Sequence, residues 1–88
     1  MTHTQQWLIE QLYSLKAKFP HISIKYGMED IINCHLIILG PQKEYDYNYD
    51  LDNYWIPIHI QFISQFDEEI AFDGPDSSLS ASKLLLEL

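Results

Sequence analysis

The sequence predicts a single α+β domain over residues 1–88, in which helices pack on one face of a small antiparallel sheet of about three strands. Three patterns lead to this fold class. Leucines with helical spacing open the chain, two apolar segments with strand character follow, and an aromatic and aliphatic segment with helical spacing lies in the second half. The length of 88 residues suits one domain, and the hydrophobic share of 47% argues against disorder. The expected order is helix, strand, strand, helix, strand, helix.

Residues 4–19 are predicted to form an amphipathic helix. Its apolar side chains recur three or four residues apart and therefore fall on one face. They are Leu8, Leu12, Leu15 and Phe19. Thr2 and Gln5 have the spacing of a capping box, and Pro20 ends the helix because its ring cannot continue one.

The next two segments predict an antiparallel hairpin. Ile22, Ile24 and Tyr26 alternate with polar residues, as in a half-buried strand. Residues 31–39 are apolar on nearly both faces, which is typical of a central strand, and Gly40-Pro41 stops them. Residues 27–30 have turn chemistry, so we expect the turn there.

Residues 42–52 are polar, acidic and rich in tyrosine, and we expect a loop. Residues 53–66 fit either a strand or a helix. The strand is supported by the alternation of Ile56, Ile58, Ile60 and Phe62. The helix is supported by two rows with helical spacing, Trp55, His59, Phe62 and Phe66 in one and Ile56, Ile60 and Ile63 in the other. The helix also accounts for Phe66 and is therefore favoured. Asp52 or Asn53 would cap it, with Pro57 near its first turn.

The last part of the chain predicts a strand, a turn and a helix. Ile70 and Phe72 share one face of residues 69–73, as in a short strand. Asp73-Gly74-Pro75-Asp76 has turn chemistry. A helix from about Ser78 is favoured over a strand, because a serine cluster that could cap it precedes an apolar run.

Charge is unevenly divided along the chain. There are 13 acidic and 5 basic residues, and the formal charge is −8. Residues 1–43 carry three acids and four lysines, whereas residues 44–88 carry ten acids and one lysine. A negative surface without arginine repels phosphate backbones and anionic membranes, so we expect no nucleic acid and no membrane as a partner. It favours a basic protein partner, although net charge also serves solubility alone.

The compartment is predicted from what the sequence lacks. The single cysteine, Cys34, excludes an intramolecular disulfide, and residues 1–10 lack the basic and apolar regions of a signal peptide. No segment reaches the roughly 20 apolar residues of a membrane span. We therefore expect a cytoplasmic protein.

Short motifs spread over most of the chain follow one layout. They are Phe19-Pro20, Ile24 and Tyr26, His35-Leu36-Ile37-Ile38-Leu39-Gly40-Pro41, Phe62-Ile63-Ser64-Gln65-Phe66 and Glu69-Ile70-Ala71-Phe72. In this layout the chain resembles a class of small uncharacterised bacterial proteins with a tyrosine-bearing strand, a strand running from histidine to proline, an acidic helix and a closing Glu-Ile-x-Phe strand. The resemblance implies a helix in residues 53–66 and transfers no functional residue. Several small acidic proteins of this kind resemble immunity proteins of toxin systems, which serves here as an analogy.

Cys34, His35 and His59 are the residues that could carry chemistry, as metal ligands or as a Cys–His nucleophilic pair in a small hydrolase. Their spacing matches no zinc signature, and neighbours in a strand point to opposite faces. We therefore expect Cys34 to be a small buried apolar residue, with His35 on the other face. No cofactor, metal site or enzymatic activity is predicted.

Two groups of carboxylates are expected to be solvated. Asp67, Glu68 and Glu69 could serve general acid–base chemistry, but a helix end followed by a solvated loop is favoured. Asp46, Asp50 and Asp52 alternate loosely like a calcium loop. They lack the glycine and the terminal glutamate that such a loop requires, so calcium is not expected.

Residues 44–55 are the most unusual segment, with four acids and five aromatic residues in twelve positions. Tyrosine and tryptophan supply large contact areas at recognition surfaces, and interleaved carboxylates steer a basic partner and pair with it. The predicted binding residues are Asp46, Tyr47, Tyr49, Asp50, Asp52, Tyr54 and Trp55. In the structural alternative, Tyr54 and Trp55 pack on the core and the other tyrosines cover the sheet edge.

The leading hypothesis is a non-enzymatic binding protein, of the immunity or antitoxin type, that engages a basic protein through residues 44–55. Three alternatives stay open. They are a DNA mimic, a small hydrolase or metal-binding protein that uses Cys34, His35 or His59, and a homo-oligomeric scaffold such as a homodimer.

Overall fold

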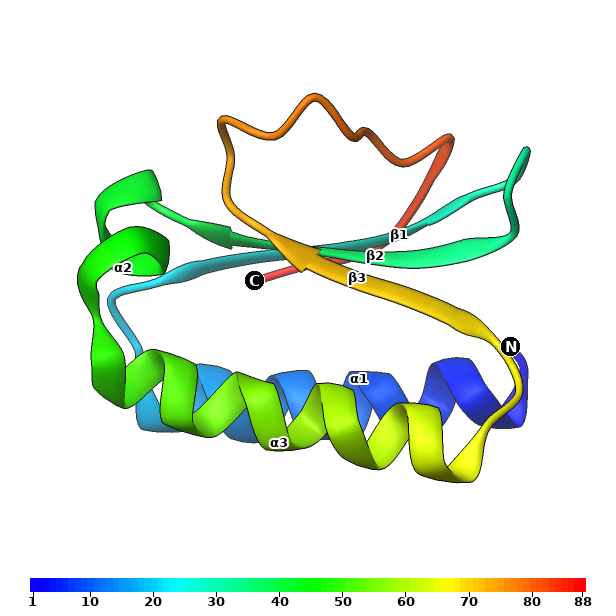
Figure 1. Cartoon of the computed structure of the whole chain (residues 1–88), viewed down its shortest axis with the longest axis horizontal. Coiled ribbons are helices and arrows are strands. Elements are labelled where there is room, and N and C mark those ends of the chain that lie inside the picture. The colour runs from blue at the N-terminus through cyan, green and yellow to red at the C-terminus, as the bar shows by residue number, and fades with distance from the viewer.

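The protein has two layers, in which the long helices α1 and α3 cover one face of a four-stranded sheet (Figure 1). This computed structural model describes residues 1–88. The elements are α1 (His3–Lys18), β1 (Ser23–Glu29), β2 (Cys34–Gly40), α2 (Gln42–Tyr47), α3 (Tyr49–Gln65), β3 (Glu69–Asp73) and β4 (Lys83–Glu87). The predicted α+β class is confirmed, and the sheet has one strand more than expected.

Helix α1 forms as the sequence predicts. The Thr2 hydroxyl accepts a hydrogen bond from the N–H of Gln5, and the Gln5 side chain accepts one from the N–H of Thr2. This capping box satisfies two backbone donors that the helix start would leave free. The stripe buried against the sheet includes Leu8, Leu12 and Leu15.

Strands β1 and β2 form the predicted antiparallel hairpin, but its turn comes later than expected. Residues 27–29 continue β1, and the turn spans residues 30–33. Ile31 and Ile32, which were expected in the second strand, are exposed in this turn. Asn33 has a φ of 51°, in the left-handed region that asparagine tolerates.

The strand order is β3-β2-β1-β4, and the sheet is mixed. Strand β1 pairs antiparallel with β2 and β4, whereas β2 pairs parallel with β3. Parallel neighbours need a long crossover, which α2 and α3 supply. The prediction of a purely antiparallel sheet was therefore wrong, because these helices return the chain so that β3 runs in the direction of β2.

Residues 42–52 are largely helical, which corrects the predicted loop. Between α2 and α3 stands Asn48, whose side chain caps α3 by accepting from the N–H of Leu51. Leu51 is fully buried and anchors the first turn of α3. The helix predicted for residues 53–66 is confirmed but begins at Tyr49, so Pro57 lies in its interior and offers no N–H to the preceding turn.

The C-terminus is the strand β4, and the predicted helix is wrong. β1 would otherwise be an open sheet edge with unpaired backbone groups. Beyond the ladder of β4, Leu88 exchanges two backbone hydrogen bonds with Ile24, of 3.0 and 2.7 Å between N and O. Residues 74–82 link β3 to β4 over the face of the sheet away from the helices (Figure 1, orange).

The core lies between the helices and the sheet. Thirteen buried side chains fill it, mainly from α1, β1, β2 and α3. Tyr26 is one of them, and next to it lies a polar side chain, His35, that is only 1% exposed. Burying polar groups is unfavourable unless they are hydrogen-bonded, so this pair marks the part of the interior where chemistry could occur.

Candidate functional site

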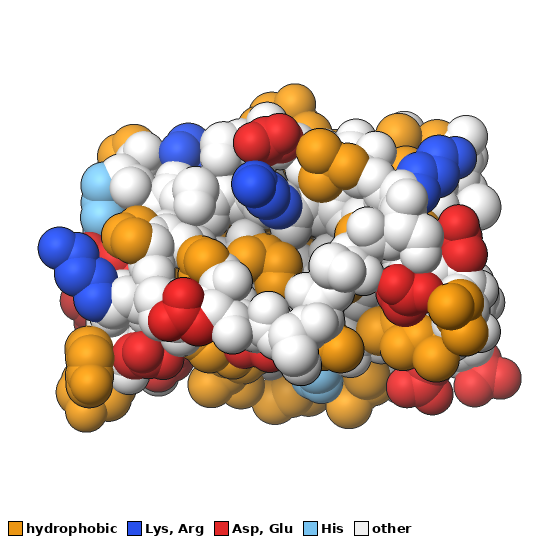
Figure 2. Space-filling view, turned by 90° about the horizontal axis from the view of Figure 1, so that it is seen from above, with side chains coloured by type: hydrophobic (Ala, Val, Ile, Leu, Met, Phe, Trp, Pro, Cys, Tyr) orange, Lys and Arg blue, Asp and Glu red, His pale blue; other side chains and the backbone are white.

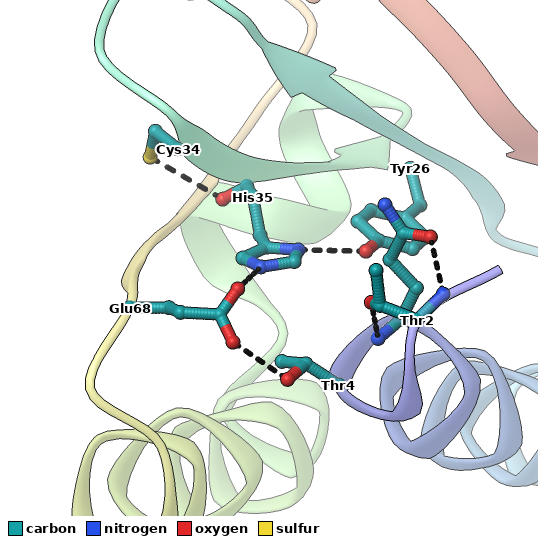
Figure 3. Close-up of polar contacts among 7 residues, drawn as sticks. Thr2, Thr4, Tyr26, Cys34, His35 and Glu68 are labelled. Atoms are coloured by element: carbon teal, nitrogen blue, oxygen red, sulfur yellow. Dashed lines mark hydrogen bonds and ion pairs between the residues drawn. The ribbon is translucent and has the colours of Figure 1, made fainter.

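The three residues proposed for catalysis or metal binding do not form one site. The Cys34 thiol contacts its neighbour only through the backbone, with Sγ 3.4 Å from the carbonyl oxygen of His35 (Figure 3). The His35 ring points toward the helices, whereas His59 lies against the rings of Trp55 and Phe72. No group of three or more His, Cys, Asp or Glu side chains lies close enough together to hold a metal ion.

The surroundings of Cys34 also disfavour a nucleophilic role. Burial raises the pKa of its thiol, and the charges of Glu69 and Glu29 raise it further. The thiolate is the reactive form of cysteine, so this environment suppresses it. The geometry thus agrees with the expectation of a small buried apolar residue.

His35 instead lies at the centre of a chain of hydrogen bonds, which we call the polar chain (Figure 3). The Tyr26 hydroxyl lies 2.7 Å from His35 Nδ1, and His35 Nε2 lies 2.8 Å from Glu68 Oε1. The Thr4 hydroxyl donates to Glu68 Oε2 at 2.6 Å. The polar chain therefore joins α1, β1, β2 and the segment that precedes β3.

The direction of each hydrogen bond follows from the carboxylate. An ionised carboxylate only accepts, so His35 Nε2 donates to Glu68, and with a neutral imidazole Nδ1 accepts from Tyr26. The hydrogen bonds from Thr4 and then from His35 hold the pKa of Glu68 below its usual value, although partial burial opposes them. Burial, and then the charge of Glu68, raises the pKa of Tyr26 far above its usual value.

The polar chain has the order of groups found in nucleophile–base–acid arrangements, but its geometry favours a structural role. The side chain at the nucleophile position, Tyr26, is 0% exposed, and its raised pKa keeps the hydroxyl protonated. Of the three ionisable members, only Glu68 reaches the surface, with its side chain 34% exposed. Because a substrate cannot reach the hydroxyl, the polar chain serves as an internal bridge.

Sequence reasoning missed the polar chain because it placed Glu68 in a solvated helix end. Strand alternation does indicate that His35 shares a face with Ile37 and that Tyr26 shares one with Ile24. No local pattern, however, indicates that Glu68 would return beside β2, which depends on the parallel pairing of β2 with β3.

Glu68→Gln should remove a pH-dependent part of the stability. Folding lowers the pKa of Glu68, so its carboxylate stabilises the folded state fully at pH values above the ordinary carboxyl range. This stabilisation is lost as the pH falls through the lowered pKa of the folded state. We expect a loss of about 1 kcal/mol in the free energy of unfolding near pH 7, a small value because Glu68 is partly exposed. Urea unfolding at several pH values should show this difference shrinking toward acid. A difference independent of pH would contradict the assignment.

The second candidate site is the segment predicted to bind a partner, and the structure divides it into two parts. Tyr47 and Tyr49 are each 74% exposed, at the junction of α2 and α3. Asp46 and Asp50 flank them and are exposed as well. We call these four residues the acidic corner.

The other predicted binding residues contribute to packing. The Trp55 ring stacks on Phe72 and on Tyr45, with ring centroids 4.9 and 5.9 Å apart, and its Nε1 donates to Asp52 Oδ1. Tyr54 packs edge-on against Phe19. Tyr54 and Trp55 thus follow the structural alternative, and both lie partly buried against the core.

The tyrosine beside the acidic corner is also anchored. The Tyr45 hydroxyl donates to the carbonyl oxygen of Phe72 at 3.2 Å. Burial raises the pKa of Tyr45, and the charges of Asp73, Asp52 and Asp46 add to this effect. Tyr45 therefore holds α2 against β3 and leaves the acidic corner as the exposed part of the segment.

The carboxylates of the acidic corner have no cationic partner within the chain. The two close contacts between a basic and an acidic side chain join histidines to glutamates, His21 to Glu44 and His35 to Glu68, and no lysine takes part in one. Asp46 accepts a hydrogen bond only from the uncharged side chain of Gln42. No lysine therefore pairs directly with a carboxylate of this corner, although Lys18 lines a shallow hollow together with Asp50.

Comparisons with known proteins add no assignment. No family model, curated protein or solved structure matches the chain. None of the three helices has both the length and the apolar character that crossing a membrane requires.

Proposed function

We propose that this domain is a non-enzymatic binding protein that recognises a basic protein through the acidic corner. The observation that carries the proposal is the pair Tyr47 and Tyr49, each 74% exposed and flanked by carboxylates without a cationic partner. Exposed tyrosines offer contact area and a polar tip at low entropic cost. Unpaired carboxylates attract a basic partner from a distance and pair with its lysines or arginines on contact.

The charge around the acidic corner supports this choice of partner. No lysine or arginine lies between Lys43 and Lys83 in the sequence, whereas nine acids do. A field of one sign raises the association rate of an oppositely charged partner and repels nucleic acid. An inhibitor of the immunity or antitoxin type, which acts in the cytoplasm by occupying a basic protein, would use such a surface.

Asp46→Asn combined with Asp50→Asn should weaken binding of the partner about tenfold, the effect expected of two partly screened charge pairs. Proteins retained on the immobilised domain at low salt, identified by mass spectrometry, should include a basic protein that the double variant retains poorly. Calorimetry with that purified protein then gives the change in Kd. The matched control is Glu10→Gln with Glu87→Gln, which makes the same charge change at exposed positions elsewhere.

Two results would contradict the proposal. One is a Kd that does not change with salt, and the other is equal loss of binding in the double variant and the control. Duplex DNA that competes for the same site on the partner would instead favour a DNA mimic, because the acidic corner would then occupy a nucleic-acid site.

A further inference from the structure

The outward face of α3 carries a row of isoleucines that the core does not use. Ile56, Ile60 and Ile63, which we call the α3 stripe, are 41, 54 and 55% exposed. Their spacing of four and three residues places them in one line along the helix. The buried residues of α3 are Leu51, Ile58 and Phe62, so the α3 stripe lies outside the fully buried core.

The area of the α3 stripe is large for a domain of this size. Three half-exposed isoleucines in a row present on the order of a few hundred Å² of apolar surface, the size at which exposed patches mark interaction sites. In Figure 2 the α3 side of the molecule forms the lower edge, where hydrophobic side chains gather between acidic ones. The exposed fractions of the three isoleucines show that the chain leaves them open to solvent, with the hairpin turn at Ile32 and Asn33 bordering a hollow beside Ile63.

Acidic residues stand at both ends of the α3 stripe. Asp50 and Asp52 lie in the first turn of α3, and Asp67 and Glu69 follow its last turn. The 17 residues of α3 extend about 25 Å at 1.5 Å per residue. The surface is therefore an apolar centre between two negative ends. Asp52 lies one turn before Ile56 on the same line, whereas Asp50 of the acidic corner lies on a neighbouring side of the helix, in a hollow with Lys18.

This charge pattern argues against a second copy of the chain as the occupant. If two α3 stripes met in antiparallel orientation, Asp52 of one copy, one turn before Ile56, would come near Asp67 of the other. In parallel orientation each acidic end would face its equivalent. Both arrangements bring like charges together, and each molecule has a formal net charge of −8, so self-association is disfavoured.

An occupant that adds a strand is also disfavoured. Strand addition needs the free backbone groups of a sheet edge, whereas the backbone of a helix is already paired. A straight row of side chains on a helix is instead the ridge against which another helix packs.

We propose that the α3 stripe docks an amphipathic helix of the partner, with large aliphatic side chains at its centre and lysines or arginines about 17 residues apart at its ends. This inference rests on the proposed function and extends the surface from the acidic corner along α3. The isoleucines supply the contact that holds the complex, and the acids at the two ends set its position.

Two synthetic peptides of about 20 residues test the inference. The first carries lysines at both ends and leucines along the middle of one face, and in the second glutamine replaces each leucine at unchanged charge. Fluorescence anisotropy should give a Kd at least about tenfold lower for the first peptide. Ile60→Asn should weaken that binding about tenfold, and Ile56→Asn and Ile63→Asn should act in the same direction.

The matched control is Leu84→Asn, because Leu84 is 53% exposed and lines the opposite face of the sheet. It should change the Kd by less than about twofold. Circular dichroism of every variant checks that α3 stays folded.

The outcomes separate this inference from the proposed function. If both peptides bind equally and only Asp46→Asn with Asp50→Asn weakens them, the α3 stripe is not a docking site, while the proposed function stands. If neither peptide binds in a charge-dependent way, both proposals are contradicted. A wild-type dimer that Ile60→Asn dissociates would also overturn the inference, because a second copy would then cover the α3 stripe.

Discussion

Replacing His35 with leucine should lower the free energy of unfolding by about 3 kcal/mol. The substitution leaves the Tyr26 hydroxyl inside the core without its acceptor, because Tyr26 is 0% exposed and water cannot replace the imidazole. It also removes the donor to Glu68 Oε1. Urea unfolding at neutral pH measures the loss. For a domain of this size, such a loss is a large part of the total stability.

A double-mutant cycle gives this prediction its control. Tyr26→Phe alone removes the donor to His35 Nδ1 and should cost about 1–2 kcal/mol. The double variant with His35→Leu should lose less stability than the sum of the two single losses, because no buried hydroxyl then lacks a partner. Strictly additive losses, or single losses below about 0.5 kcal/mol, would show that the polar chain does not stabilise the fold.

Replacing Gly27 with alanine should cost about 2–3 kcal/mol and loosen β4. A Cβ atom at this position would clash with the backbone oxygen of Lys83 and would lie 2.5 Å from Cβ of Ala81. The backbone of Lys83 cannot move aside without breaking the pairing of β4 with β1, whose register already shifts between Tyr26 and Gly27. Hydrogen exchange should therefore show lost protection in β4, and urea unfolding should show the loss of stability.

Gly74→Ala is the matched control for this change. The three atoms nearest to its Cβ would all belong to the end of the Gln42 side chain, which can rotate away at the cost of its hydrogen bonds with Asp46 and with the N–H of Asp76. We expect a loss below about 1 kcal/mol with β4 still protected. If Gly27→Ala were as stable as Gly74→Ala, the close approach of β4 to β1 would not limit this position.

The titratable groups with good geometry and the residues exposed for recognition lie in different parts of this protein. The polar chain unites titratable groups in good geometry, yet its tyrosine is sealed from solvent. The acidic corner has no such geometry, but it exposes what a protein partner can reach. Helix α3 contributes to the interior and to the surface, because Phe62 packs against the His35 ring on one face while Ile60 is exposed on the other.

Local patterns in the sequence determined the features that depend on neighbouring residues. The capping box of Thr2 and Gln5, the hairpin of β1 and β2, and the helical nature of residues 53–66 all follow from side chains a few positions apart. The uneven charge is likewise a property of the sequence. The row of Ile56, Ile60 and Ile63 is also visible in the sequence, but only the structure shows that the core leaves it exposed.

Only the tertiary structure decided the rest, since the deciding contacts join residues far apart in the chain. Residues 83–87 have a sequence that suits a helix or a strand, and the open edge of β1 selects the strand. The helix start at Tyr49 depends on a buried site for Leu51, which separates exposed Tyr47 and Tyr49 from packed Tyr54 and Trp55. Glu68 meets His35 because α3 returns the chain alongside β2, a pairing over 33 residues that no local spacing encodes.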